Sequence, residues 1–364
     1  MKIVFFSPYL PKHFGGGEKY LLDCAAIMAQ AGHQVYVACA RQTPISAAEA
    51  SQIKQAYEDF FHIDLSLVQL ISTPLFTSDK WYQKLWWTRQ FDCLYYQTDG
   101  SLFFSLATEN ILHIQVPFTS KKSSWLERLK LSNYQIKNTN SHFTKQQIEK
   151  SWQTKIDFVH QPYVNLREFD KQKIEKENII LSVGRFFCQL HSKRQDVLVE
   201  MFGLLYKQLP SNWRLVLVGQ REDEEFADRV HRLAKDLPID FVHQADRDQL
   251  INYYQKASIY WHAAGYQIDE ELNPEKVEHF GISTLEAMAA EAVPVVINKG
   301  GQKEILSPEL ESCLWNSKED CLQKTLSLVK DSVDRQKLST LAKKKSLEFS
   351  KKKFAKILIK MVEG

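Results

Sequence analysis

Short apolar runs alternate with segments of helical pattern along the first part of the chain. Lys2–Pro8 is almost continuously apolar, as in a parallel strand that is buried on both faces. A run of glycines follows, then a helical pattern over Glu18–Ala31 and a second apolar run over Gln34–Ala40. This order predicts a right-handed β-α-β unit that opens a doubly wound α/β domain. Further strands are predicted over Leu67–Ile71, Cys93–Gln97, Ile111–Gln115, Ile136–Asn140 and Asp157–His160.

A second series of the same kind begins after the charged, glycine-free stretch Lys171–Asn178. Two α/β domains in tandem are therefore predicted, with the junction in this stretch. The predicted strands of the second domain are Ile179–Val183, Leu215–Val218, Ile239–Val242, Ile259–His262 and Val293–Ile297. Helical patterns lie between them over Gln195–Leu209, Glu224–Leu237 and Arg247–Lys256.

The end of the chain is rich in lysine and has a helical period. Apolar residues recur at helical spacing at Leu347, Phe354, Leu358 and Met361, which predicts an amphipathic helix. Solvation is the preferred interpretation of its lysine-bearing face. Attraction to anionic lipid is the alternative.

Two carboxylates, Glu278 and Glu286, lie on either side of a glycine turn that opens a helical pattern. Positions eight apart differ by about 80° around a helix, so one continuous helix would not align both acids. We expect Glu278 in the loop before the helix and Glu286 one turn inside it. The amides of Gly281, Ile282 and Ser283 would then form a helix N-terminus, which binds phosphate well. Acids beside an anion site would repel the anion unless each of them accepts hydroxyl groups on either side of it. A nucleotide sugar has that arrangement, with a ribose on one side of a diphosphate and a hexose on the other.

This Glu-x7-Glu pattern contains Phe280-Gly281 and is followed by Leu-Glu-Ala-Met-Ala-Ala and Pro-Val-Val. The combination resembles the donor-site signature of glycosyltransferase family 4, whose members are retaining enzymes. The resemblance implies the GT-B architecture, in which two Rossmann-like domains with parallel sheets face an interdomain cleft. It implies an acceptor-side domain over 1–170, a nucleotide-sugar donor domain over 171–342, and a C-terminal helix over 343–364 that crosses back to the first domain.

In the first domain, the glycine loop and one histidine are candidate site residues. Gly16 and Gly17 follow the first strand, where backbone can approach a pyrophosphate without a Cβ in the way. No acid stands at 36–44, which argues against a dinucleotide site. The resemblance implies that this loop contacts the donor phosphates, and that His113 lies near the donor hexose. A flexible turn and a structural histidine are the alternatives.

In the second domain, Arg185 and Lys193 match the family positions that neutralise the diphosphate. Negative charge accumulates on the leaving phosphate oxygen, and fixed cations and helix amides can stabilise it. Transfer independent of a metal ion, with no cofactor beyond the nucleotide sugar, is therefore expected. Arg194 stands where the family has glycine, so either Lys193 or Arg194 could point inward. His243, at the end of a predicted strand, matches the place where the family binds the base.

Several further features have a less specific meaning. Glu291 takes the place of a glycine that the family has at the helix end, which should cost only local stability. The acidic insertion 265–276 is either a lid over the donor or an acceptor contact. Gly300-Gly301 resembles a family element that supports packing of the site. The histidines at 13, 142, 262 and 279 are weaker candidates.

Composition narrows the class of protein. The length of 364 residues and a hydrophobic content of 44% suffice for a core in each domain. Six scattered cysteines fit a reducing cytoplasm rather than a disulfide framework or a zinc site. A net charge of +3 gives no reason to expect a nucleic-acid partner. Aromatic residues lie beside cations at 81–87 and 121–128; core packing is the preferred interpretation, and peripheral contact at the inner face of a membrane is the alternative.

The sequence therefore predicts a retaining hexosyltransferase that uses a nucleotide diphosphate sugar and a glycan or lipid-linked acceptor. Glu286 should hold the ribose hydroxyls and Glu278 should orient the donor sugar. A nucleotide-sugar-binding protein without turnover and a sugar-nucleotide epimerase on the same fold are the alternatives. Neither the base, the hexose nor the acceptor follows from the sequence.

Overall fold

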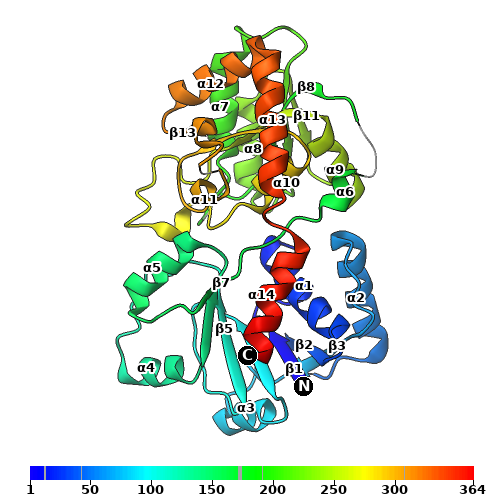
Figure 1. The fold of residues 1–364 in the computed structure, drawn as a ribbon, viewed down its shortest axis with the longest axis vertical. Coiled ribbons are helices and arrows are strands. Elements are labelled where there is room, and N and C mark those ends of the chain that lie inside the picture. Colours follow the sequence, from blue (N-terminus) through cyan, green and yellow to red (C-terminus); the bar gives the residue numbers. More distant parts are fainter. Residues whose placement is uncertain (12–13, 42, 171–173, 191, 307) are drawn as a thin grey trace. The chain divides into compact units, whose positions relative to one another are not determined.

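A computed structural model describes residues 1–11, 14–41, 43–170, 174–190, 192–306 and 308–364. The chain forms two compact units, which are described separately here (Figure 1). Unit 1 comprises Met1–Pro162 and Lys352–Gly364, and unit 2 comprises Tyr163–Lys351. No helix in the described ranges is both long enough and apolar enough to cross a bilayer.

Unit 1 is built on a parallel sheet of seven strands in the order β3-β2-β1-β4-β5-β6-β7. This order steps outward from β1 in both directions, as in a doubly wound fold. Apolar strand residues such as Val4 and Tyr95 are fully buried, which explains the nearly continuous apolar runs. The strands are β1 Lys2–Phe6, β2 Gln34–Ala40, β3 Val68–Thr73, β4 Cys93–Gln97, β5 Glu109–Ile114, β6 Ile136–Thr139 and β7 Phe158–Val159.

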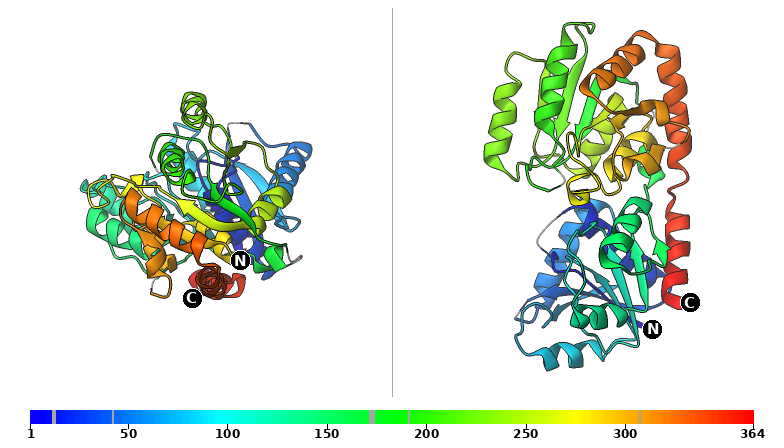
Figure 2. Two further views of the ribbon diagram at one scale, coloured as in Figure 1. Left: turned by 90° about the horizontal axis from the view of Figure 1, so that it is seen from above. Right: turned by 90° about the vertical axis from the view of Figure 1, so that its left-hand side faces the viewer.

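The last helix of the chain, α14, belongs to unit 1. Its apolar side packs inward through Phe354, Leu358 and Met361, and the Phe354 carbonyl oxygen lies 3.0 Å from His160 Nε2. The two chain ends lie close together (Figure 2). The His33 ring joins them, since it contacts both the Met1 amine and Glu363. The helices of unit 1 are α1 Gly16–Gln30, α2 Ala47–Phe61, α3 Trp81–Thr88, α4 Trp125–Ser132, α5 His142–Trp152 and α14 Lys351–Glu363.

Unit 2 has a parallel sheet of six strands in the order β10-β9-β8-β11-β12-β13. Each predicted strand of this domain is present within two residues of its expected bounds. The short edge strand β13 was not predicted. The strands are β8 Glu177–Val183, β9 Arg214–Val218, β10 Ile239–Val242, β11 Ala257–His262, β12 Val293–Ile297 and β13 Leu314–Trp315. The predicted fold class, two Rossmann-like domains with parallel sheets, is confirmed.

The helices of unit 2 connect these strands. They are α6 Leu166–Asp170, α7 Gln195–Tyr206, α8 Glu224–Leu233, α9 Arg247–Lys256, α10 Ile282–Ala289, α11 Gln302–Leu306, α12 Lys318–Lys330 and α13 Ser332–Ser346, with short 3-10 turns at Pro274–Lys276 and Glu311–Cys313. Helix α10 begins at the residue after Gly281, as the glycine turn predicts.

The unit boundaries differ from the expected 170 and 343. Residues 163–170 pack with unit 2, where Val164 donates its amide to the Phe349 carbonyl and Phe169 is part of the core. The predicted junction at 171–178 begins with residues 171–173, which lie outside the described part, and ends inside β8. The single helix expected over 343–364 is interrupted between α13 and α14, and Leu347 is exposed there instead of lying on an apolar stripe.

Candidate functional site

The ends of three neighbouring strands of unit 2 bring the candidate residues together. Strands β8, β11 and β12 are adjacent and parallel, so their carboxyl ends meet at one edge of the sheet. The loop after β8 carries Lys193, β11 ends at His262, and Gly300 follows β12. This edge is where ligands bind in open α/β sheets.

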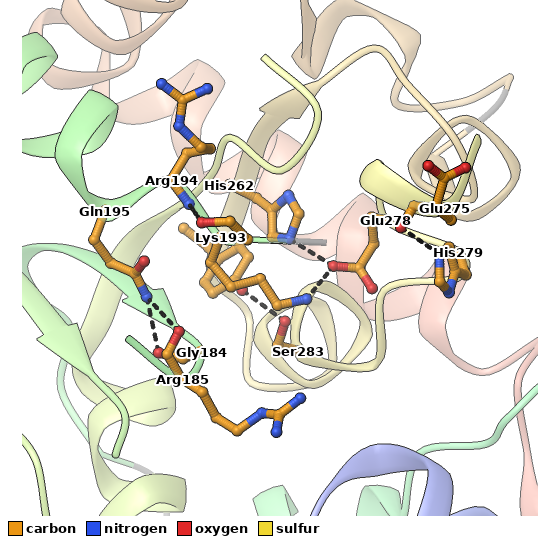
Figure 3. A network of polar contacts seen from close by, with 12 residues as sticks. Gly184, Arg185, Lys193, Arg194, Gln195, His262, Glu275, Glu278, His279 and Ser283 are labelled. Atoms are coloured by element: carbon orange, nitrogen blue, oxygen red, sulfur yellow. Dashed lines mark hydrogen bonds and ion pairs between the residues drawn. The ribbon is translucent and has the colours of Figure 1, made fainter. Parts of the chain in front are cut away.

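Glu278 receives two side-chain donors at this edge (Figure 3). The Lys193 ammonium forms an ion pair with Glu278 Oε2, and His262 Nε2 lies 2.8 Å from the same oxygen. An ionised carboxylate carries no proton, so the imidazole donates. Lys193 was predicted as a site residue, whereas His262 was only one of several weaker candidates.

The charges of this cluster follow from its burial. Burial alone would raise the pKa of Glu278, but Lys193 and the His262 hydrogen bond outweigh it and hold the pKa well below its ordinary value. Burial lowers the pKa of His262, against the opposing effect of Glu278. His262 is therefore neutral near pH 7, and its Nδ1 atom has no hydrogen-bond partner among the described residues. Glu278 stays an acceptor and can take a hydroxyl group.

The position of Lys193 depends on a glycine. A Cβ on Gly184 would lie 2.4 Å from Lys193 Cγ, so only glycine leaves room for the lysine stem. Gln195 holds the same loop by donating its side-chain amide to the carbonyl oxygens of Gly184 and Arg185. Arg194 turns elsewhere, to Asp196 and to the Tyr266 carbonyl oxygen. Lys193, and not Arg194, therefore points toward Glu278.

Arg185 does not join this cluster in the structure. Its guanidinium pairs with Glu222 at 2.8 Å, and in Figure 3 no dashed line joins it to Glu278. The side chain is 42% exposed, which leaves it free to turn. Its predicted contact with a diphosphate stays a prediction.

The start of α10 has the geometry that the glycine turn predicts. Gly281 has φ 115°, a left-handed conformation that favours glycine, and α10 begins at Ile282. Ser283 Oγ accepts a hydrogen bond of 2.8 Å from the Tyr260 hydroxyl. Beside this turn, the Gly301 amide donates to the Glu278 carbonyl, and a Cβ on Gly300 would lie 2.1 Å from that oxygen. The glycine pair therefore fastens the backbone of Glu278 in the loop before the helix.

Glu286 lies inside α10, as expected, but it already has a partner. Its Oε1 atom lies 2.7 Å from Arg247 Nη1, and Arg247 also pairs with Glu168 at 2.6 Å. Burial alone would lower the pKa of Arg247, but the two carboxylates raise it above its ordinary value. Arg247 and Glu168 were missed in the sequence, since nothing in it places residue 168 beside residue 286. Ribose hydroxyls would have to share Glu286 with Arg247.

His243 is also already paired. Its Nδ1 lies 3.1 Å from the Gly219 carbonyl oxygen and its Nε2 lies 2.8 Å from His231 Nε2. Burial, followed by the neighbouring His243, lowers the pKa of His231. The ring of His243 lies just past the end of β10, so its predicted place at a strand end is correct. Its contact with a base stays a prediction.

The insertion 265–276 is fastened to the loop after β12. Glu270 accepts the Gly300 amide at 2.6 Å and pairs with Lys303 at 2.6 Å. Lys299 donates to the Ile268 carbonyl oxygen from the same loop. These contacts connect the insertion with the glycine pair that holds Glu278.

The predicted site residues of unit 1 lie at the start of α1 and in β5. Gly16 and Gly17 open α1, and a Cβ on Gly17 would lie 2.6 Å from the Gln115 side-chain amide. His113 is fully buried, stacks on Tyr20 at 4.2 Å between ring centroids, and lies 2.6 Å from Asn138 Oδ1. Burial lowers the pKa of His113 to about 4. This environment favours a structural role for His113, and a role at the site stays a prediction.

The remaining histidine candidates that the structure describes lie outside the contacts that join Lys193, His262 and Glu278. His142 begins α5, His279 Nε2 contacts the Glu275 carbonyl at 3.2 Å, and His13 lies outside the described residues. The chain has one Asp-x-Asp sequence at 246–248, where Asp246 caps α9. In the described ranges, no three or more His, Cys, Asp or Glu side chains are grouped so as to hold a metal ion.

Comparison with known proteins finds a family match in unit 2. Residues 165–345 match the family model "Glycosyl transferases group 1". A Homo sapiens "GDP-Man:Man(3)GlcNAc(2)-PP-Dol alpha-1,2-mannosyltransferase" is 26% identical over 209 residues, which are 53% of this chain and 40% of that protein. The Dictyostelium discoideum protein of the same name is 34% identical over 140 residues, or 35% of this chain and 25% of that protein. The chain thus spans less than half the length of these curated relatives.

Solved structures match along nearly the whole chain. Anabaena HepE in complex with UDP aligns with a TM-score of 0.73 and 15% identity, covering 100% of both chains. Staphylococcus aureus TarM aligns with a TM-score of 0.74 and 10% identity, covering 98% of both chains. The fold of the chain is that of the GT-B glycosyltransferases, and residues 165–345 form a domain of the glycosyl transferases group 1 family.

Proposed function

We propose that the protein is a retaining glycosyltransferase that moves a hexose from a nucleotide diphosphate sugar to a lipid-linked glycan. The observation that carries this proposal is the buried, ionised Glu278 held between Lys193 and His262 beside the N-terminus of α10. The group 1 match over the same residues supports it. The two curated relatives are named as mannosyltransferases that use GDP-Man and a PP-Dol acceptor, so GDP-mannose is the first donor to test.

In this proposal the residues of the cluster divide the work on the donor. Glu278 Oε2 takes both protein donors, and Oε1 accepts a hydroxyl of the donor hexose and orients the sugar. The bond between the sugar and the β-phosphate oxygen breaks with its electron pair on the phosphate. Lys193 and the amides at the start of α10 stabilise that charge. We assign no protein nucleophile. The acceptor hydroxyl attacks from the face that the phosphate leaves, forms the new glycosidic bond, and gives its proton to the departing phosphate oxygen.

Glu286 is proposed to bind the ribose while Arg247 keeps its charge compensated. A lone buried carboxylate would be costly, and the Arg247 pair with Glu168 anchors the arginine from its other side. Glu286 can then accept a ribose hydroxyl with its second oxygen. Arg185 is proposed to leave Glu222 for the diphosphate. Gly16 and Gly17 are proposed to contact the donor phosphates, and His243 to lie near the base.

The test is release of GDP from GDP-mannose by purified protein, together with the affinity for GDP measured by calorimetry. Glu278→Gln should abolish release and leave GDP affinity nearly unchanged, since the proposed partner of Glu278 is the hexose. Glu286→Gln should weaken GDP binding about tenfold, the effect of one hydrogen bond to a charged group. The matched control is Glu200→Gln in α7, where the exposed Glu200 pairs with Lys318. It should change neither quantity.

Two outcomes would contradict the proposal, and a third would change its donor. Unchanged turnover in both Glu278→Gln and Glu286→Gln would reject the assigned roles. If the protein binds GDP but turns over none of the nucleotide sugars offered as donors, the alternative of a nucleotide-sugar-binding protein is supported. Stabilisation by UDP rather than GDP in a thermal shift assay would redirect the donor from GDP-mannose to a UDP sugar, since a ligand that binds the native state raises its melting temperature.

A further inference from the structure

Three tryptophans of unit 1 stand out from the surface of two short helices. Trp81 and Trp86 of α3 are 70% and 62% exposed, and Trp125 of α4 is 73% exposed. Tyr82 and Leu129 of the same helices are also exposed. Core packing, the preferred interpretation of these segments in the sequence, is therefore wrong for these side chains.

The two helices and one loop form a continuous surface. The loop between β4 and β5 donates the Leu106 amide to Thr88 Oγ1 at the end of α3. One residue earlier, Ser105 exchanges hydrogen bonds with Asn133, at the end of α4. Leu106 is 49% exposed between the helices. Figure 1 and the right-hand view of Figure 2 place α3 and α4 at the same end of unit 1. We call this the tryptophan surface, comprising α3, α4 and residues 104–106.

The charges around these side chains are mostly positive. Segments 79–91 and 121–133 hold seven lysines and arginines and only two acids. Lys80 and Lys121 are exposed, and Arg89 lies over the Trp86 ring at 4.9 Å. Tryptophan favours the interface between water and lipid, and cations next to it are attracted to anionic headgroups. Exposed aromatic residues surrounded by cations thus complement an anionic bilayer in both properties.

We propose that the tryptophan surface is a docking site for an anionic lipid bilayer. The aromatic rings enter the headgroup region, and the surrounding cations contact the lipid phosphates. A bilayer as the partner of this surface rests on the proposed function, because a lipid-linked acceptor lies in a membrane. Only residues of unit 1 form this surface, and a test of vesicle binding needs neither donor nor acceptor.

The experiment is cosedimentation of the full chain with phosphatidylcholine vesicles that contain or lack phosphatidylserine. The protein should bind the vesicles with phosphatidylserine, and added salt should weaken the binding. The variant Trp81→Ser, Trp86→Ser, Trp125→Ser should bind at least about tenfold less. The variant Lys80→Gln, Lys121→Gln should also bind about tenfold less, but only to vesicles with phosphatidylserine. GDP affinity should stay unchanged in both variants.

The matched control changes three exposed apolar residues of unit 2. Leu204, Leu272 and Val333 are 60%, 73% and 79% exposed, so serine there removes a similar kind of surface. This control should bind vesicles like the unchanged protein. The proposal is overturned if the unchanged protein ignores both vesicles or if the control loses binding equally. It is also overturned if the protein self-associates without lipid and only the tryptophan variant abolishes that association, because the surface would then join two copies of the chain.

Discussion

The two donors on Glu278 differ in charge and in mobility. Lys193 is a charged side chain on a loop, and a diphosphate can attract it away from Glu278. His262 is neutral, fully buried and fixed at the end of β11. The carboxylate therefore keeps its orientation through His262 when Lys193 engages a ligand. We infer that His262 positions Glu278 without touching the donor itself.

Replacing His262 separates this positioning role from a packing role. His262→Leu should lower kcat/KM for the donor about ten- to a hundredfold, the effect of one hydrogen bond to a charged group. His262→Gln should recover most of that loss, because its amide nitrogen can donate near the place of Nε2. Steady-state kinetics and GDP calorimetry give the two quantities, and GDP affinity should not change. Equal losses of kcat/KM in the glutamine and leucine variants would show that His262 contributes by packing only.

Single residues were predicted from the sequence only where a local pattern carries them. Glu278, Lys193 and the α10 turn follow from short motifs with fixed spacing. His262 gave no more signal than any histidine at a strand end. The pairing of Arg247 with Glu168 and Glu286 joins three distant segments, which periodicity and spacing cannot reveal.

At the scale of elements, α10 ends in an unusual way. Glu291 has φ 63°, and the Ala292 amide donates to the Ala287 carbonyl oxygen, which is the pattern of a helix end that favours glycine. The positive φ explains why a glycine would suit the place that Glu291 takes at this helix end. Glu291 also pairs with Lys343 of α13 at 2.8 Å, which offsets part of the backbone strain.

Glu291→Gly should therefore stabilise the protein once that ion pair is removed. In a Lys343→Met background, Glu291→Gly should raise the free energy of unfolding by about 1 kcal/mol, since glycine adopts the left-handed conformation without a Cβ clash. Urea denaturation measures this change in the free energy of unfolding. The control is Glu200→Gly in the middle of α7, where the same substitution should cost about 1 kcal/mol. A loss of stability at both positions would contradict the argument.

The periodicity of the sequence predicted which helices and strands are present, but it did not predict where a helix is interrupted. The lysine-rich tail has an uninterrupted helical pattern, yet the chain leaves the helix between α13 and α14. There the Phe349 carbonyl oxygen accepts a hydrogen bond from the Val164 amide. The Phe349 ring packs on the Phe280 ring, with 5.7 Å between the ring centroids. These tertiary contacts override a local preference for helix, so the break could not be predicted from the tail alone.

On the scale of whole units, the buried histidines make unit 1 sensitive to acid. Burial lowers the pKa of His113 to about 4 and that of His160 to about 3, from an ordinary value of 6.5. Below pH 6.5 these two histidines become protonated in the unfolded chain but stay neutral in the folded unit. The unfolded state therefore binds more protons, and stability falls as the pH drops from 6.5 toward 4.

His113→Phe should remove part of this dependence. At pH 5 the histidine costs about 2 kcal/mol relative to pH 7, and phenylalanine keeps the stack on Tyr20 without titrating. Urea denaturation at both pH values, followed by hydrogen exchange of unit 1 peptides, measures the difference. Asn138 Oδ1 keeps a hydrogen bond from Tyr95 in the variant. The same loss of stability on acidification in both proteins would show that His113 does not contribute.

The tandem architecture could be predicted because each domain repeats the same alternation of strand and helix. The boundary at 162 could not, because residues 163–170 owe their place to the unit 2 core rather than to any local signal.

Unit 1 is discontinuous, and this has a consequence for biosynthesis. Unit 2 occupies one uninterrupted segment, whereas Phe354 must reach back to Tyr20 and His160 across the whole of it. During translation, unit 2 can fold as soon as its residues have left the ribosome. The side chains of Tyr20 and His160 meanwhile lack their contacts with α14, so the half of the molecule that is made first is the last to be finished.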